Sequence, residues 1–159
     1  MPDDPSSSNR RIVIPVGGGK GAHYCLQYIR TMGLNPEEVT LLAVQDDMDK
    51  YNKISSRNKA LARIDRQTQS LGRCMEFCQR NQLNCKSASR VSHIPTDGKS
   101  SSERIAQEVC NYAVENNIAT IMTGSRKISG LKRWVIGSIG QLIHRDCDKC
   151  HYVQVRHPN

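Results

Sequence analysis

The sequence is poor in aromatic residues and has no long apolar run. Its 159 residues include one Trp, one Phe and five Tyr, which leaves few side chains on which nucleic-acid bases could stack. No stretch approaches the roughly 20 apolar residues that span a bilayer, and the polar segment 1–10 lacks the apolar core of a secretory signal. We therefore expect a soluble, cytoplasmic protein with no membrane segment and no specific nucleic-acid partner.

Cysteine is frequent, but the number of cysteines is odd. Most of the seven lie at apolar positions of expected helices, as reduced core thiols of a cytosolic protein do. We therefore expect no disulfide framework. The seven are Cys25, Cys74, Cys78, Cys85, Cys110, Cys147 and Cys150.

Length and charge bound the class of protein. A chain of 159 residues is long enough for one core, so we expect a disordered tail over 1–10 and a single domain over 11–156. Lys and Arg total 23 against 15 Asp and Glu, a net charge of +8, which favours anionic partners. The basic residues are scattered through several segments, which fits a small anion better than DNA or RNA.

Apolar periodicity predicts strands that alternate with helices. Five strands and four helices in alternation imply a doubly wound α/β fold, with a mostly parallel sheet and helices on both faces. The last helix is expected to start near Leu131, and the helix before the third strand has an apolar stripe that includes Leu61. The strands are expected at 11–16, 39–44, 85–94, 118–124 and 151–155, and the helices at about 22–29, 57–82, 100–117 and 131–143.

Two glycine clusters follow strands, at 17–21 and 124–137. In doubly wound sheets, ligands bind in the crevice outside the carboxyl ends of the strands. Because both clusters lie at that edge, we expect them to face one shared crevice.

The first cluster, in "PVGGGKGA", matches a relaxed dinucleotide fingerprint through Gly17, Gly19 and Ala22. Asp46 or Asp47, after the second strand, would supply the acidic residue of such a site. A small oxidoreductase is therefore one hypothesis, although the chain has no room for the substrate domain that a dehydrogenase normally carries.

The second cluster, "GSRKISGLKRWVIGS" at 124–138, places Gly137 and Ser138 thirteen residues after Gly124. This spacing resembles the universal stress protein family, whose nucleotide binders carry Gly, two residues, Gly, nine residues, then Gly and Ser or Thr. Lys127 stands where the second glycine is expected. The resemblance extends from "RIVIPV" through "VTLLAV" to "HYVQVR", nearly the whole chain, and implies a five-stranded sheet in the order 3-2-1-4-5.

The resemblance also implies roles for residues. The segment from Thr123 to Lys127 would wrap the ribose and phosphates of a nucleotide, and the segment 137–139 would give backbone N–H groups and a hydroxyl to the phosphates. Residues matching Pro15 and Val44 hold the adenine end in relatives. The expected ligand is ATP, or AMP or ADP, with or without Mg²⁺. The candidate cofactor-binding residues are Pro15, Val16, Gly17, Val44, Thr123, Gly124, Ser125, Arg126, Lys127, Gly137, Ser138 and Ile139.

Two departures from the family pattern leave an alternative open. Gly17 stands where ATP-binding members usually have Asp, which removes or replaces an adenosine contact. Lys127 either blocks the site by its bulk or supplies a cation to a phosphate. The alternative is a nucleotide-free, dimeric interaction protein of the same family. Under either hypothesis we expect a homodimer that pairs through its last strand at "HYVQVR", as relatives do.

Metal binding and catalysis are less favoured. His144, Cys147, Cys150 and His151 fall within eight residues, but structural zinc usually gathers ligands from two separated segments, so we expect no metal site. The sequence contains no nucleophile elbow and no recognisable catalytic triad. We expect a binding module with, at most, slow ATP hydrolysis.

Overall fold

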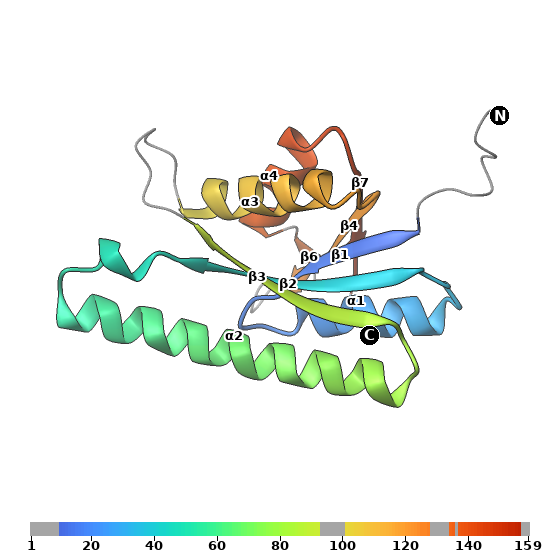
Figure 1. Ribbon diagram of the computed structural model, residues 1–159, viewed down its shortest axis with the longest axis horizontal. Coiled ribbons are helices and arrows are strands. Elements are labelled where there is room, and N and C mark those ends of the chain that lie inside the picture. The colour runs from blue at the N-terminus through green and yellow to red at the C-terminus, as the bar shows by residue number, and fades with distance from the viewer. Residues whose placement is uncertain (1–9, 93–100, 128–133, 136, 157–159) are drawn as a thin grey trace.

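The computed structural model describes residues 10–92, 101–127, 134–135 and 137–156. A five-stranded parallel sheet with strand order β3-β2-β1-β4-β7 forms the middle layer (Figure 1). This confirms the predicted fold class and the order 3-2-1-4-5, with β7 as the fifth strand of the sheet. Its strands are β1 (Arg11–Pro15), β2 (Glu38–Asp46), β3 (Cys85–Ser92), β4 (Thr120–Gly124) and β7 (His151–Val155).

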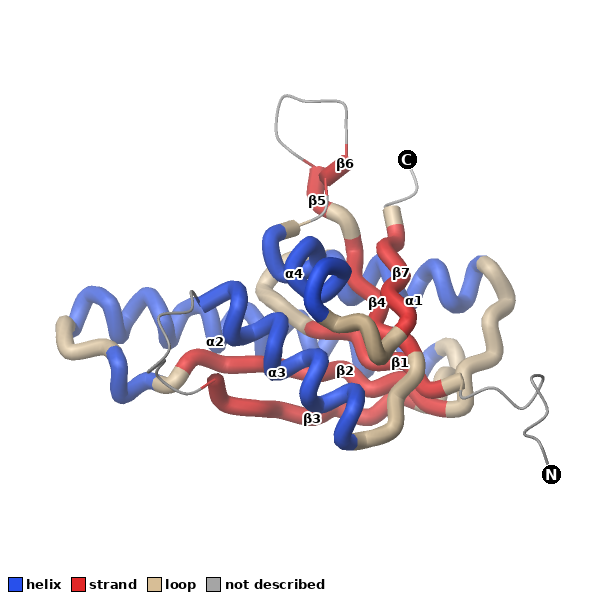
Figure 2. Tube along the Cα trace, turned by 90° about the horizontal axis from the view of Figure 1, so that it is seen from above, coloured by secondary structure: helices blue, strands red, loops and turns tan. Residues whose placement is uncertain are grey.

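Helices cover both faces of the sheet. Helices α1 and α2 pack on one face, and α3 and α4 pack on the other (Figures 1 and 2). A short 3-10 turn, η2 (Met48–Lys50), follows β2. The α-helices are α1 (Gly21–Thr31), α2 (Ile54–Arg80), α3 (Ser101–Glu115) and α4 (Ser138–Asp146). Of the helices that the structure describes, none is long and apolar enough to cross a membrane.

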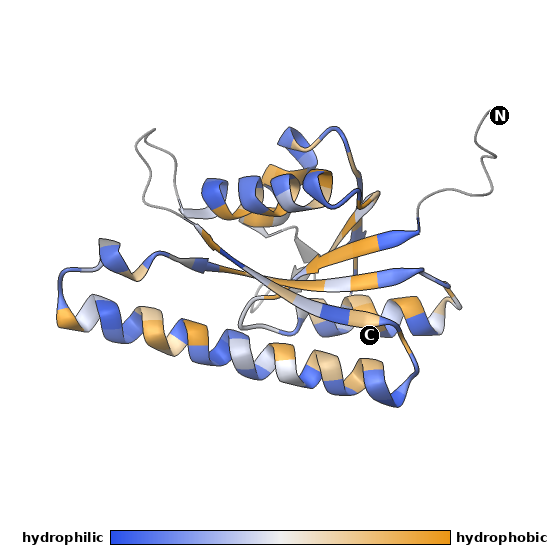
Figure 3. Ribbon diagram, in the orientation of Figure 1, coloured by the Kyte–Doolittle hydropathy of each residue, from blue (hydrophilic) through white to orange (hydrophobic). Residues whose placement is uncertain are grey.

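Strand β1 shows why the sheet is central. Ile12 and Ile14 pack in the core beneath α1 and α2, whereas Val13 packs with α3 and α4. Successive side chains of a strand point to opposite faces, so a continuous apolar run fits a parallel strand that is buried on both sides. Colouring by hydropathy shows this apolar centre, with hydrophilic residues outside (Figure 3).

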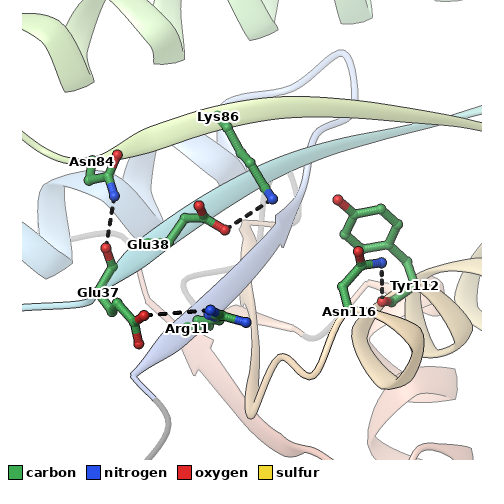
Figure 4. Close-up of polar contacts among 7 residues, drawn as sticks. All are labelled: Arg11, Glu37, Glu38, Asn84, Lys86, Tyr112 and Asn116. Carbon is green, nitrogen blue, oxygen red and sulfur yellow. Dashed lines mark hydrogen bonds and ion pairs between the residues drawn. The ribbon is translucent and has the colours of Figure 1, made fainter.

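Polar contacts join the amino ends of the three neighbouring strands, at the edge opposite their carboxyl ends (Figure 4). Arg11 lies 3.5 Å from the carboxylate of Glu37, and Lys86 lies 3.1 Å from that of Glu38. Asn84 Nδ2 donates to the carbonyl of Glu37 at 2.9 Å. Exposed ion pairs contribute about 0–1 kcal/mol each, so these contacts add little to the stability of the fold.

The segment before α4 differs from the predicted helix. The helix was expected over about 131–143, but α4 begins at Ser138, and Trp134–Val135 forms β6, which pairs antiparallel with β5 (Arg126–Lys127). Aromatic and β-branched residues favour strands, and Gly137 is a poor helix former that precedes α4 in an extended conformation. The prediction of helix at 134–135 and at 137 was therefore wrong; residues 131–133 and 136 lie outside the described ranges.

Leu61 does not belong to the packed face of α2. Its side chain is 52% exposed, whereas Ala60, Ser70, Cys74 and Cys78 are buried. One residue is a rotation of about 100° along a helix, which moves Leu61 off the stripe that contacts the sheet. Its predicted place on the apolar stripe was wrong.

The structure contains two disulfides, so the expectation of none was wrong. Cys78 in the last turn of α2 is bonded to Cys85 at the start of β3, and Cys110 of α3 is bonded to Cys147 at the end of α4. The second pair is 37 residues apart in sequence and meets only because α3 packs on α4. Free cysteines are Cys25, Cys74 and Cys150; burial raises the pKa of the Cys74 thiol to about 11, so this thiol is protonated at neutral pH.

Candidate functional site

A cavity of about 510 Å³ opens at the carboxyl ends of β1 and β2. Its walls come from these strand ends, from the glycine run that follows β1, from α2, and from single residues of α3 and α4. It is therefore at the edge of the sheet where the sequence predicts a ligand crevice. The lining residues are Pro15, Val16, Gly17, Gly18, Gly19, Leu42, Val44, Gln45, Ala60, Arg63, Ile64, Arg66, Gln67, Ile105 and Ile139.

Helix α2 holds the glycine run in place. Ser70 Oγ donates to the carbonyl of Gly19 at 3.1 Å. A Cβ on Gly18 would lie 3.2 Å from the Cβ of Arg66, whereas a Cβ on Gly17 or Gly19 would meet nothing within 4 Å. Gly18 is thus the position at which this run passes closest to α2.

The charged side chains of the lining are cationic. Arg63 and Arg66 both come from α2, and none of the described residues that line the cavity carries a carboxylate. Arg63 donates to the hydroxyl of Tyr51 at 2.9 Å. Arg66 is exposed and stands against the glycine run. Guanidinium groups beside free backbone are suited to phosphate oxygens, so the cavity favours an anionic ligand.

Gly124 of the second glycine cluster lies against Gly21 of the first. A Cβ on Gly124 would lie 2.5 Å from the Cα and the carbonyl oxygen of Gly21. Only a residue without a side chain allows the end of β4 to pass this close to the start of α1. Gly124 therefore brings β4 against the first cluster.

Five of the predicted site residues line the cavity, and Thr123 and Ser125 lie at the carboxyl end of β4. The five are Pro15, Val16, Gly17, Val44 and Ile139. Thr123 shares a hydrogen bond with the hydroxyl of Tyr152 on β7. Ser125 is 4% exposed, and its N–H donates to the carbonyl of Val155 at 2.8 Å. Thr123 thus bonds to β7, and the side chain of Ser125 is buried.

The remaining predicted residues belong to β5 and to the start of α4. Arg126 and Lys127 form β5, and the structure describes their backbone. Gly137 is the N-cap of α4 with φ −65° and ψ 162°, and its carbonyl accepts a hydrogen bond from Gln141 N at 3.0 Å. The first N–H groups of α4 follow directly, at Ser138, in the part of a helix that attracts anions.

The family model described as universal stress protein family matches residues 8–149. The chain belongs to the universal stress protein family. Among curated protein sequences, none matches this chain at a significant level.

Solved structures of universal stress proteins share the fold at low sequence identity. The protein UspA from Lactobacillus plantarum is 18% identical, with a TM-score of 0.60 over 92% of this chain and 97% of its own. The Archaeoglobus fulgidus protein is 14% identical, with a TM-score of 0.60 over 91% and 97%. A family member from Arabidopsis thaliana, solved with AMP bound, is 10% identical, with a TM-score of 0.58 over 93% and 92%.

Sequence reasoning missed Gln45 and three polar residues that α2 contributes to the cavity in this universal stress protein. Arg63, Arg66 and Gln67 all come from one side of α2. Their spacing of three and four residues places them together on a helix, but a polar stripe of this kind is usually a solvated helix face. Only the packing of α2 across the end of β2 directs them to the cavity.

Residues on which the dinucleotide-site and zinc-site hypotheses depend have other partners in the structure. Asp47 accepts a hydrogen bond from Asp49 N at 3.0 Å and caps η2, so this carboxylate, a candidate for a dinucleotide site, has a structural partner. Cys147 is bonded to Cys110, which removes one of the four residues considered as zinc ligands. Within the described ranges, no three His, Cys, Asp or Glu side chains cluster as a metal site would require.

Proposed function

We propose that this universal stress protein binds an adenine nucleotide, ATP or AMP and ADP, in the cavity at the carboxyl ends of β1 and β2. One observation carries the proposal: a 510 Å³ cavity joins a glycine run and the cation Arg66 to an apolar wall. The AMP bound to the Arabidopsis relative supports the same ligand class.

The two sides of the cavity suit the two ends of a nucleotide. Val44, Ala60, Ile64 and Ile105 offer an apolar wall for a flat base. Gly17–Gly19 and Arg66 offer open backbone and a cation for phosphates. The resemblance adds the segments 123–127 and 137–139 at the ribose and phosphates. In this orientation the base contacts the apolar wall, and the phosphates contact the glycine run and Arg66.

Magnesium fits as a companion of the nucleotide and does not fit as a resident ion. Mg²⁺ sites in proteins usually include one or two carboxylates together with substrate phosphates, and the described lining has none. Mg²⁺ would therefore be held by the phosphates of ATP and by water. We accordingly infer a binding module in stress response or signalling, with ATP hydrolysis slow if it occurs.

Calorimetric titration of ATP and AMP into the purified protein tests this proposal. We expect both to bind, with ATP about tenfold tighter, because its two additional phosphates gain about one charge-assisted contact worth 1.5 kcal/mol. The difference in affinity between ATP and AMP should decrease as the salt concentration is raised. Absence of binding by either nucleotide would favour the second candidate function, a nucleotide-free interaction protein, which the replacement of the family's Asp by Gly17 supports.

We also propose that the protein forms a homodimer through β7. This strand is the outermost of the sheet, and an unpaired strand edge is a ready template for pairing with a second copy. His151 N donates toward β4, to the carbonyl of Ala119, and Ser125 N donates to the carbonyl of Val155. Backbone groups of alternate residues in a strand face opposite sides, so the N–H of Gln154 faces the free edge.

The change Gln154→Pro should convert the dimer to a monomer while preserving the fold. Proline removes the outward N–H of residue 154 and places its ring at the free edge, where proline is tolerated, while the bonds between β4 and β7 remain. Light scattering at micromolar concentration measures the mass of both proteins, and circular dichroism checks folding. A monomeric wild type, or a Gln154→Pro variant that remains dimeric, would contradict pairing through β7.

A cytoplasmic location is the last part of the proposal. The cytoplasm is a reducing compartment in which disulfides are rare. The two disulfides of the structure therefore argue against a cytoplasmic location. The proposal therefore requires that Cys78–Cys85 and Cys110–Cys147 exist as thiols in the cell. Alkylation of thiols before lysis, followed by mass spectrometry, measures this state directly.

A further inference from the structure

Strand β1 ends before β2 does, which leaves a backbone acceptor of β2 without a strand partner. The register between them ends at Pro15 and Leu42, and Val16 N still donates to the carbonyl of Leu42 at 2.8 Å. Carbonyls two residues apart in a strand point to the same side, so the carbonyl of Val44 also points toward the β1 side. There, however, the chain has already turned into the glycine run.

The side chain of Gln67 on α2 supplies the missing donor. Its Nε2 lies 2.8 Å from the carbonyl oxygen of Val16 and 3.3 Å from that of Val44. Gln67 is half-buried and lines the same cavity as both valines. One NH₂ group therefore bridges two carbonyls at the boundary between the glycine run and the apolar wall.

The exocyclic amino group of adenine is also a planar NH₂ donor. A base that packs against the apolar wall of Val44, Ala60 and Ile64 brings its edge to the strand ends, where the carbonyls of Val16 and Val44 lie. We propose that Gln67 occupies the hydrogen-bond acceptors that an amino-substituted base would use, and so sets the affinity and base preference of the site. This inference rests on the proposed nucleotide function and deepens it.

The consequence is a weak preference for the amino base in the wild-type protein. When an amino base displaces Gln67, one donor replaces another, and the net gain in hydrogen bonding is small. Without the Gln67 donor, the carbonyl of Val44 is unpaired until an amino base arrives, and a base with an oxo group presents a second acceptor to it. Removal of the donor should therefore increase the preference for the amino base.

The experiment compares AMP with IMP, which carries an oxo group in place of the amino group of AMP. Wild type, Gln67→Met and Gln67→Glu are titrated with both nucleotides by calorimetry. Methionine keeps the length of the side chain without an N–H donor, and an ionised glutamate keeps its shape without one. Gln69→Met is the matched control, because Gln69 is exposed on the same helix and its Nε2 donates to Asp65 Oδ2 at 3.1 Å.

We expect AMP and IMP to bind the wild type within about threefold of each other, and the ratio of their dissociation constants to rise about tenfold in Gln67→Met and Gln67→Glu. The ratio should remain at the wild-type value in Gln69→Met. Glutamate adds a negative charge that weakens the binding of both nucleotides alike. The diagnostic quantity is therefore the ratio of the two dissociation constants and not either affinity alone. Circular dichroism and urea unfolding confirm that each variant is folded.

Two negative results are distinguishable. If the Gln67 variants bind AMP and IMP with the wild-type ratio, Gln67 acts only in packing; the inference is then overturned while the nucleotide function stands. If no protein in the series binds either nucleotide, the proposed function fails and this inference fails with it.

Discussion

The change Gly124→Ala should lower the free energy of unfolding by about 3 kcal/mol or more, the upper range for adding a methyl group to a packed site. The added Cβ would lie 2.5 Å from both Cα and O of Gly21 and 2.8 Å from its carbonyl carbon. All three atoms belong to backbone, so no side chain can rotate to relieve the contact. Strand β4 would have to move away from α1, which disturbs the junction of the two glycine clusters.

Two further glycines provide matched controls for Gly124→Ala. A Cβ on Gly19 would meet nothing within 4 Å, and one on Gly21 would lie 3.5 Å from the nearest backbone atom of Gly124, an ordinary van der Waals contact. Urea unfolding should place Gly19→Ala and Gly21→Ala within about 1 kcal/mol of wild type. A Gly124→Ala protein as stable as these controls would show that the two backbones do not meet as described.

The change Gly137→Val should abolish nucleotide binding, with a loss of affinity of about a hundredfold or more, corresponding to about 2.7 kcal/mol. Gly137 has φ −65° and ψ 162°, an extended conformation that valine also adopts. The backbone therefore tolerates the change, and the isopropyl group would occupy space beside the first N–H groups of α4, where we propose that phosphates bind. Calorimetry with ATP measures the loss, and circular dichroism confirms folding.

Two neighbouring changes refine this test. Ser138→Ala should weaken ATP binding about tenfold to a hundredfold, because it removes one charge-assisted hydrogen bond worth about 1.5–3 kcal/mol. Lys127→Gly distinguishes the two roles of Lys127: a phosphate ligand predicts lost affinity and lower salt sensitivity, and a blocking side chain predicts tighter binding. If Gly137→Val binds ATP as the wild type does, the phosphates do not reach α4.

Local patterns were sufficient for most of the fold. The apolar run of β1 and the periodicity of α3, in which Val109 and Ala113 are buried, depend on which side of an element faces the core. Such patterns repeat every two or 3.6 residues and can be read within one segment. They failed for 134–135 and for 137, where the pairing of β6 with β5 and the extended Gly137 took precedence over a helical pattern.

The residues of the candidate site also fall into those that a local sequence pattern indicates and those that it does not. Glycine spacing and the resemblance indicated Pro15, Val16, Gly17 and Val44, because these residues belong to segments with a recognisable local pattern. Nothing in the spacing indicated Gln67, whose partner Val16 is 51 residues away.

The sequence by itself determined the alternation of strands and helices, the family, and the edge of the sheet at which ligands are expected. Only the tertiary structure decided which distant residues meet: Gln67 with the carbonyls of Val16 and Val44 at that edge, and Cys110 with Cys147 where α3 packs on α4. The physical reason is that apolar periodicity fixes the buried face of each element through local geometry. The partner of a polar or sulfur atom depends instead on how whole elements pack, and small rotations or shifts of a helix change that partner without changing the pattern.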